Sequence, residues 1–427
     1  MTDLQHPADP EWPATDPAWP ADTPAPADAV PLYGPRYQRD PAGLYAEIRR
    51  LHGPVAPVLL EGDIPAWFVC GYREVHQVTS DSQLFARDTR RWNEWEHVPP
   101  DWPGIGFVAY NSSVMFAEGA EHRRRAGAIS DALDAVDQFE LGAQCEQLAD
   151  QLIDTFASSG EADLMSQYAS PLPLLVTAKL YGLPESETPD LVRDITLAVN
   201  AYEDSANAHK RVQATMERLL ELKRESPGPD IPSRLLAHPA NLTDEEIVLD
   251  LTVVIAAAHL PSAYWIGNTI QLMLTDDRFA MTLSGGRGSV GQALNEVLWY
   301  DTPTQNYIGR FATRDTQLGG QRIRTGDLLV LGLAAANADP QIRPAPGSTS
   351  NSAQMSFGHG EHGCPWPAPE VAEVISKTTV EVLLDRLPDL ILAVPAEALE
   401  WQPSVWMRGL TALPVTFTPT YVPPNPA

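Results

Sequence analysis

The segment Phe357–Pro365 carries the strongest chemical signal in the sequence. It reads Phe-Gly-His-Gly-Glu-His-Gly-Cys-Pro, and its glycines Gly358, Gly360 and Gly363 permit sharp backbone conformations and close approach to a flat ligand. Cys364 follows these glycines, and an apolar segment predicted as a helix comes shortly after. The positive end of a helix dipole favours the thiolate, which is the form of cysteine that binds metals. We therefore interpret Cys364 as a candidate metal ligand, with a buried free cysteine as the alternative.

Periodicity and capping residues predict the elements around this segment. Apolar residues recur at steps of three and four between Leu141 and Phe156, as on the buried face of a helix. Thr243 is a predicted N-cap for a long apolar helix, with Glu246 three residues later. Two adjacent glycines at 319–320 indicate a hairpin. The predicted helices cover about 41–51, 141–156, 243–274 and 370–387, and the predicted strands cover 55–60 and 65–72. The balance is a mainly α-helical fold with small β-sheets.

The composition argues against several classes of protein. The chain has 427 residues and a formal net charge of −27, from 29 Lys and Arg against 56 Asp and Glu, so its surface repels the phosphate backbone of nucleic acids. Its three cysteines are far apart and include no CxxC pair, which argues against a disulfide framework or a structural zinc site. The N-terminus has no basic region followed by an apolar run, and no stretch approaches the ~20 apolar residues of a membrane helix. We expect a cytoplasmic protein that binds neither nucleic acid nor membrane.

The first residues differ in composition from the rest of the chain. They are rich in proline and acidic residues, and no Lys or Arg precedes Arg36. Such a segment cannot bury enough apolar surface to offset the entropy lost on ordering. We expect residues 1–35 to form a disordered tail and residues 36–427 to form a single domain.

These segments together resemble the cytochrome P450 superfamily, especially its soluble actinobacterial members. Residues 357–364 match every fixed position of the family's haem loop, FGxGxHxC. The segments "LTDEEI" (242–247), "WIGN" (265–268) and "ANADP" (336–340) fall in the family's order and spacing, and the resemblance covers most of the chain beyond the tail. It implies the cytochrome P450 fold around haem b, with Cys364 as the axial thiolate. A thiolate on haem iron favours O–O cleavage.

The resemblance also implies which residues contact the haem. The residues implied to bind the cofactor are Phe357, Gly358, Gly360, His362, Cys364, Arg310 and His122. Arg310, His362 and His122 would bind the haem propionates, and a guanidinium suits a carboxylate because it donates bidentately. Without the resemblance, Arg310 would be interpreted as an exposed strand charge and His122 as a surface helix residue.

Two departures from the family pattern lie in predicted helices. In the family's Glu-x-x-Arg motif, Trp299 stands in the arginine position, where its indole N–H can donate one hydrogen bond to Glu296 but brings no charge. In the long helix, Leu260 and Pro261 replace the acid and the alcohol that relay protons to dioxygen in the family. Pro261 also frees the carbonyl of Ala257 and should kink the helix.

Two further residues of the long helix bear on the chemistry, and a third departure from the family pattern follows Cys364. Ser262 supplies a hydroxyl one position along the long helix, which turns it about 100° around the axis. His259 offers a proton or a distal ligand, or it packs against neighbouring helices. We name both as candidate catalytic residues beside Cys364. The third departure is the proline-rich stretch after Cys364, where Pro369 would clash within an established helix, so we expect that helix to begin later.

The leading functional hypothesis is a haem-thiolate monooxygenase that inserts one oxygen atom into a small organic or secondary-metabolite substrate. Its electrons would come from ferredoxin and ferredoxin reductase, with an acidic partner docking at the basic cluster His122–Arg125, which is otherwise a solvated helix face. Because the relay pair is absent, the alternative is atypical chemistry on the same fold, such as aryl coupling, peroxide use or rearrangement. A third hypothesis is a degenerate haem-binding protein held in a partner complex.

Overall fold

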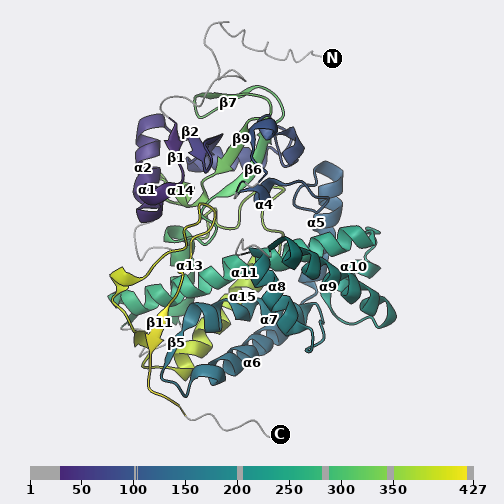
Figure 1. Cartoon of the computed structure of the whole chain (residues 1–427), viewed down its shortest axis with the longest axis vertical. Helices are drawn as coiled ribbons and strands as arrows, with labels where there is room; N and C mark the ends of the chain where they lie inside the picture. The colour runs from purple at the N-terminus through teal and green to yellow at the C-terminus, as the bar shows by residue number, and fades with distance from the viewer. Residues whose placement is uncertain are drawn as a thin grey trace, which may run out of the picture.

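The computed structural model describes residues 29–420 except Asp101, Pro103 and residues 200–204, 281–287 and 344–350. A β-rich region near the N-terminal end adjoins a larger helical region, and helix α11 runs across the middle of the molecule (Figure 1). The predicted fold class, mainly α-helical with small β-sheets, is confirmed.

The larger sheet has six strands in the order β1-β2-β3-β9-β6-β4. Its strands are β1 (Val30–Pro31), β2 (Val55–Leu60), β3 (Ile64–Val69), β4 (Phe85–Ala86), β6 (Tyr307–Ala312) and β9 (Leu328–Leu331). The predicted strands β2 and β3 pair antiparallel, and their turn holds Gly62 and Asp63 at φ values of 78° and 59°. Strand β6 carries Arg310 in a buried position. The sheet therefore positions one of the predicted site residues.

Two smaller sheets complete the β structure of the described residues. One joins β10 (Ile391–Leu392), β11 (Pro414–Thr416) and β5 (Glu161–Asp163). The other is the predicted hairpin, in which β7 (Thr316–Leu318) and β8 (Gln321–Ile323) pair antiparallel. Gly319 and Gly320 both adopt positive φ in its turn. The hairpin prediction is confirmed.

The described residues include several before Arg36, where the sequence analysis placed the start of the domain. β1 pairs in parallel with β2, and α1 (Gly34–Arg39) follows it directly. Leu32 is buried in the core beside this sheet, so these residues gain the apolar contacts that the tail composition did not suggest. The boundary at residue 35 is corrected to an earlier position, and residues 1–28 of the predicted tail lie outside the described residues.

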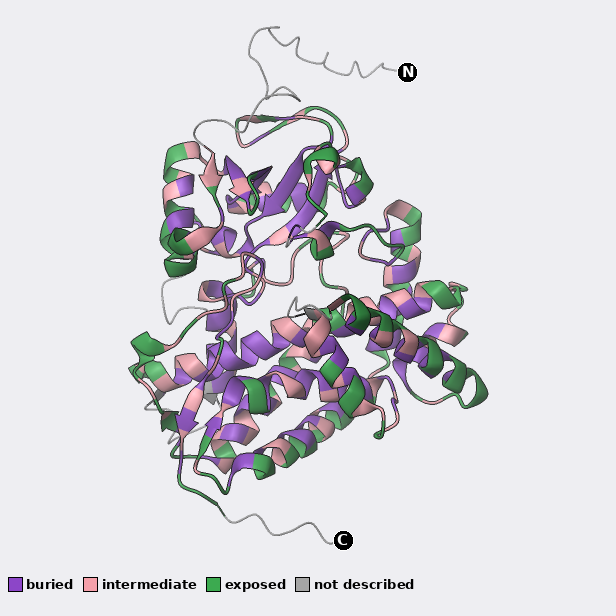
Figure 2. Cartoon of the chain, viewed as in Figure 1, coloured by how far each residue is buried: buried purple, intermediate pink, exposed green. Residues whose placement is uncertain are grey.

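Helices form the larger region and pack around α11. The helices after α1 are α2 (Pro41–His52), α3 (Tyr72–Ser80), α4 (Ile105–Val108), α5 (Gly119–Asp134), α6 (Gln138–Phe156), α7 (Pro171–Leu180), α8 (Thr188–Val199), α9 (Ser205–Glu225), α10 (Ile231–Ala237), α11 (Asp244–Thr275), α12 (Asp277–Ala280), α13 (Gly288–Tyr300), α14 (Leu333–Asn337) and α15 (Ala368–Arg386). The short helical turns are η1 (Thr89–Arg91), η2 (Trp95–His97), η3 (Met165–Ala169) and η4 (Ala396–Ala398). α11 contacts α7, α9, α13 and α15, and buried residues line the helices that face one another (Figure 2).

The start of α11 is the predicted capping box. The Thr243 side chain accepts from the Glu246 N–H, and the Glu246 carboxylate accepts from the Thr243 N–H. α11 is also the one described helix that is long and apolar enough to cross a membrane, which corrects the expectation that no stretch has that character. Half of its most apolar stretch is buried inside the molecule, as in the core helix of a globular protein.

The helix after the Cys364 loop begins earlier than expected. α15 starts at Ala368, and Pro369 lies in its first turn. The first N–H groups of a helix have no partner within the helix, so a proline there removes no hydrogen bond. Pro369 is therefore compatible with the helix.

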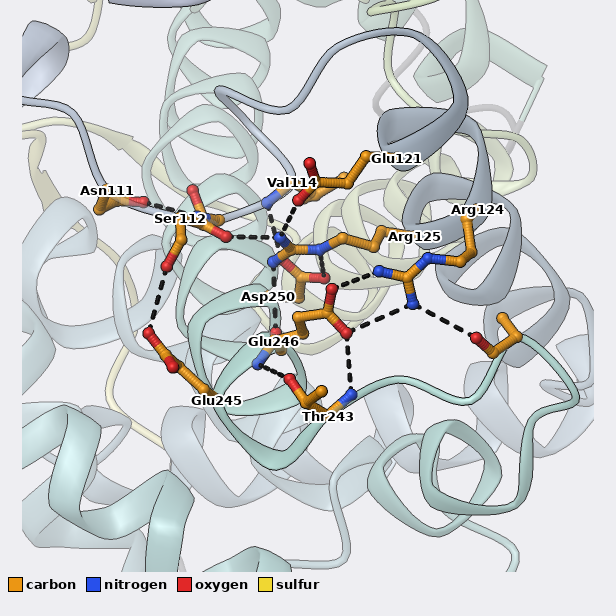
Figure 3. A network of polar contacts seen from close by, with 12 residues as sticks. Asn111, Ser112, Val114, Glu121, Arg124, Arg125, Thr243, Glu245, Glu246 and Asp250 are labelled. Atoms are coloured by element: carbon orange, nitrogen blue, oxygen red, sulfur yellow. Dashed lines mark hydrogen bonds and ion pairs between the residues drawn. The ribbon is translucent and has the colours of Figure 1, made fainter.

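A buried ion-pair network fastens α5 to the first turns of α11 (Figure 3). Arg125, 1% exposed at its side chain, donates from Nε to Asp250 Oδ2 at 2.9 Å, and the Asp250 side chain is fully buried. Asp250 also accepts from the Val114 N–H at 2.7 Å, and Arg125 donates to the Ser112 carbonyl. Arg124 pairs with Glu246 of the capping box. The network thus holds α5, the 112–114 segment and α11 together.

A second buried carboxylate, that of Glu296 on α13, forms an ion pair with Arg278 on α12. Glu296 is 4% exposed and accepts from Arg278 Nη2 of α12 at 2.6 Å. The Trp299 indole N–H instead donates to the Asn351 carbonyl at 3.3 Å. The expected bond from Trp299 to Glu296 is therefore corrected. Arg278 lies 18 residues before Glu296 in the sequence, so its pairing cannot be recognised from local spacing.

Removing Arg125 should destabilise the protein strongly. We expect Arg125→Met to lower the free energy of unfolding by about 3–5 kcal/mol, because it leaves Asp250 buried without a cation. The matched control is Arg123→Met, which removes an exposed pair with Glu361 and should cost less than about 1 kcal/mol. Urea unfolding of the two variants checks this, and equal costs would contradict the assignment of Arg125 as the buried partner.

Removing Arg278 should have a smaller but measurable effect. We expect Arg278→Ala to cost about 1–3 kcal/mol of unfolding free energy, because Glu296 loses its donor while the arginine itself is partly exposed. Arg322→Ala is the control, since it removes a pair with Asp315 that is exposed on both sides. Urea unfolding measures both, and an Arg278→Ala protein as stable as the control variant would show that Glu296 does not depend on this guanidinium.

Candidate functional site

Two glycines fix the shape of the loop that carries Cys364. Gly360 has a φ of +73°, and a Cβ atom there would stand 2.1 Å from the Thr79 carbonyl oxygen. Gly358 has a φ of +71°, also in the region that other residues disfavour. The Cys364 N–H donates to the Phe357 carbonyl oxygen at 2.8 Å and closes the loop. Glycine is therefore required at both positions by backbone conformation, and at 360 also by space.

The Cys364 thiol lies among many protein atoms but remains accessible. The residue is exposed, yet burial of the thiol raises its pKa to about 12. Both observations fit a thiol that borders open space inside a crowded environment. Burial disfavours the charged form of the thiol, so in the absence of a bound cation Cys364 is protonated at neutral pH. A thiolate here needs a cation, and a coordinated metal deprotonates a thiol.

Basic side chains gather beside the loop. Arg310 is 2% exposed, and its Nε and Nη1 atoms have no hydrogen-bond partner within the described parts of the chain. Burial, with the nearby charge of Arg87, lowers the pKa of Arg310 to about 9. The rings of His122 on α5 and His362 in the loop lie with centroids 4.0 Å apart. Burial and then the charge of Arg310 lower the pKa of His362 to about 2. The structure thus brings together the three residues predicted to bind propionates.

Arg87 belongs to the same cluster and was not predicted from the sequence. It follows β4 and is 2% exposed. Its Nη1 donates to the carbonyl oxygens of Ile308 and Gly309 at 2.8 and 2.7 Å, and its Nε donates to that of Met115 at 3.1 Å. Gly309 has a φ of +100°, and a Cβ there would lie 2.6 Å from Arg87 Nη1. In the sequence Arg87 is one of several charges in a short polar stretch, and no spacing distinguishes it.

Among the residues that the structure describes, no carboxylate forms an ion pair with the Arg87 or Arg310 guanidinium. The two carboxylates whose charge acts on Arg310 are Glu118 and Glu361. Glu118 is paired with Arg91 and Glu361 with Arg123, each at 3.0 Å. Uncompensated buried charge is costly, so the cluster is suited to an anionic ligand. A flat ring with two carboxylates next to a thiol, as in the haem that the resemblance implies, fits this donor set.

One face of α11 is left open opposite the loop. Ala256 and Ala257 are exposed in the middle of this core helix, and Leu260 and Pro261 are only partly buried. The Trp265 ring, further along α11, lies 5.7 Å from that of Phe357 in the Cys364 loop. The open face and the loop are therefore neighbours.

His259 and Ser262 lie on the buried side of α11 and not on this open face. They are 1% and 5% exposed. The His259 Nε2 atom lies 3.2 Å from the Ser170 Oγ atom at the start of α7, and burial lowers the pKa of His259 to about 4. His259 therefore packs against a neighbouring helix, which was the alternative reading of this residue. This burial does not support a catalytic role for either side chain, because neither lies on the open face.

Comparison with known proteins identifies relatives along almost the whole chain. No protein-family model matches the chain. A vitamin D(3) 25-hydroxylase from Pseudonocardia autotrophica is 27% identical over 399 residues, covering 91% of this chain and 96% of that protein. The cytochrome P450 monooxygenase PikC from Streptomyces venezuelae is 29% identical over 396 residues, covering 90% and 92%.

The fold of this chain matches solved structures of the same kind. The structure of CYP154C4 from Streptomyces sp. W2061 superposes with a TM-score of 0.79 at 30% identity, covering 91% of this chain and 97% of that one. Three observations support the same family. They are the glycine-containing Cys364 loop, the buried guanidiniums of Arg87 and Arg310, and this structural match. The chain belongs to the cytochrome P450 superfamily, as an oxidoreductase whose cofactor is haem.

Proposed function

We propose that this protein is a haem-thiolate monooxygenase with Cys364 as the axial ligand, acting on a small organic or secondary-metabolite substrate. The observation that carries the proposal is the pair of buried, anion-free guanidiniums of Arg87 and Arg310 beside the Cys364 loop. Haem with a thiolate ligand supplies the chemistry that cleaves dioxygen. The haem lies between the loop and the open face of α11 in this proposal.

Each predicted haem contact has a distinct task. Arg310, His362 and His122 hold the two propionates, and the bound anions offset the cost of burying Arg310. Arg87 orients the backbone around Arg310 through its bonds to the carbonyls of β6 and adds positive potential. Phe357, Gly358 and Gly360 keep the loop close beneath the ring. Metal binding at Cys364 makes its thiolate stable despite burial.

The open face of α11 supports an apolar substrate but no side-chain proton relay of its own. Its residues are Val253, Val254, Ala256, Ala257, Ala258, Leu260 and Pro261. None of them has a titratable or hydroxyl group. This observation favours a second candidate on the same site, namely a reaction that needs no acid–alcohol pair, such as coupling or peroxide use. The degenerate binding protein has no specific support from the geometry.

The electron donor and the cellular location are also part of the proposal. Ferredoxin and ferredoxin reductase remain the proposed donors, but docking at the cluster 122–125 is not supported. Arg125 is buried with Asp250, Arg124 pairs with Glu246, and exposed Arg123 pairs with Glu361. A cytoplasmic location is consistent with Cys70, Cys145 and Cys364 all being free thiols. We propose one haem-binding domain from about residue 29 onward.

Replacing Arg310 should change haem affinity and the stability of the apoprotein in opposite directions. We expect Arg310→Met to bind haem about 10- to 150-fold more weakly, because it loses charge-assisted hydrogen bonds to a propionate. The haem-free variant should be at least as stable as the haem-free wild type, because an unpaired buried charge is gone. Haem titration and urea unfolding of the apoprotein measure the two effects. Arg314→Met, at an exposed position just past β6, should change neither. Unchanged haem affinity in Arg310→Met would contradict the propionate role.

The proposed ligand and reaction are tested by spectroscopy and isotope labelling. We expect the reduced, carbon-monoxide-bound wild type to show a thiolate-type absorption band, Cys364→Ala to lose it, and Cys70→Ala to retain it. Turnover with a redox partner and labelled dioxygen should place one labelled oxygen atom in the product. A thiolate-type band in Cys364→Ala would overturn the ligand assignment. Product without label would favour the second candidate reaction.

A further inference from the structure

Pro261 removes one hydrogen bond from the middle of α11. The helix runs without interruption from Asp244 to Thr275 with this proline inside it. A proline has no N–H, so the carbonyl of the residue four positions earlier, Ala257, loses its regular partner within the helix. A backbone carbonyl without a partner is a strong acceptor, and proteins rarely leave one unused.

The missing bond lies on the accessible side of the helix. Residues four positions apart lie one above the other on a helix, so Ala257 and Pro261 share a face. Ala257 is exposed and Pro261 is only partly buried, whereas His259 and Ser262 are buried on the other side. The contact between Trp265 and Phe357 places this stretch of α11 beside the Cys364 loop. The Ala257 carbonyl, which lacks its i+4 N–H partner, therefore belongs to the exposed stretch of α11 beside the loop.

The side chains around this carbonyl offer no competing polar group. The neighbouring open positions carry Ala256, Ala258 and Leu260, and one turn earlier Val253 and Val254. The nearest hydroxyl on the first half of the helix, that of Thr252, donates back to the Val248 carbonyl at 2.8 Å. On this face of α11 a ligand therefore meets apolar surface with a single backbone acceptor. Such a pattern orients a mostly apolar ligand through one polar group.

We propose that the Ala257 carbonyl is a substrate-binding group that accepts a hydrogen bond from a hydroxyl or amine of an otherwise apolar substrate. This inference rests on the proposed function, because it takes the open face of α11 as the substrate side of the haem. Pro261 stands where the family has an alcohol side chain that can donate a hydrogen bond. Pro261 cannot donate one, but it leaves the Ala257 carbonyl able to accept one. Substrates with a donor group near their site of oxidation are selected over equally shaped hydrocarbons.

The test compares two ligands of similar shape on the purified haem protein. Cyclohexanol carries a donor, and methylcyclohexane has a methyl group in its place. Their affinities are measured by spin-state titration and by calorimetry for wild type, Pro261→Ala and Leu260→Ala. Alanine restores an N–H at position 261 and is the residue that helices favour most. Leu260→Ala reshapes the same face but leaves the Ala257 carbonyl free.

We expect the ratio of the two affinities to fall by about 2- to 12-fold in Pro261→Ala and to stay unchanged in Leu260→Ala, as the loss of one net hydrogen bond requires. Comparing ratios cancels the different hydration of the two ligands. An unchanged ratio in Pro261→Ala, with its thiolate-type spectrum intact, overturns the inference alone. Loss of haem binding or of the thiolate-type spectrum in the wild type overturns the proposed function instead. Circular dichroism of both variants confirms that α11 is retained.

Discussion

The site depends on positive charge that the protein buries without neutralising. Arg310 has unused donors at 2% exposure, and Arg87 is equally buried beside it with only carbonyls and a phenol as partners. The nearby carboxylates are paired with other arginines. Much of the surrounding structure serves this arrangement, including the positive φ of Gly309 and the network that fastens α5, with its His122, to α11. In the proposed function, the anionic groups of the cofactor offset the cost of burying this charge.

Local patterns in the sequence predicted the parts of the molecule that depend on local physics. The Cys364 loop was predicted because its glycines are required by the backbone itself, and α11 because Thr243 and Glu246 cap its first turn. Arg87 was not found, since its role depends on carbonyls more than 200 residues away in the chain. The burial of His259 and Ser262 could not be predicted from the sequence for another reason. Which side of α11 is open is decided by packing against α7 and not by the helix's own sequence.

The departures at Leu260 and Pro261 bear on the reaction, whereas the Cys364 loop bears on cofactor binding. The Cys364 loop and the buried cations are the parts to which we assign cofactor binding, and the chain retains the fold of the superfamily. Leu260 and Pro261 alter only the face opposite the loop, where protons and substrate are handled. In the proposed function, changes at Leu260 and Pro261 therefore bear on the reaction and not on the residues assigned to hold the haem.

The pairing of Glu296 with Arg278 has a consequence for attempts to improve the protein by consensus design. Restoring the family residue with Trp299→Arg would bring a second guanidinium to a carboxylate that already has one. The indole that occupies this buried volume and bonds the Asn351 carbonyl would be lost at the same time. Arg278 would keep its pair with Asp276, so two guanidiniums would compete for the single Glu296 carboxylate. Positions 278 and 299 are therefore best changed together in such a design.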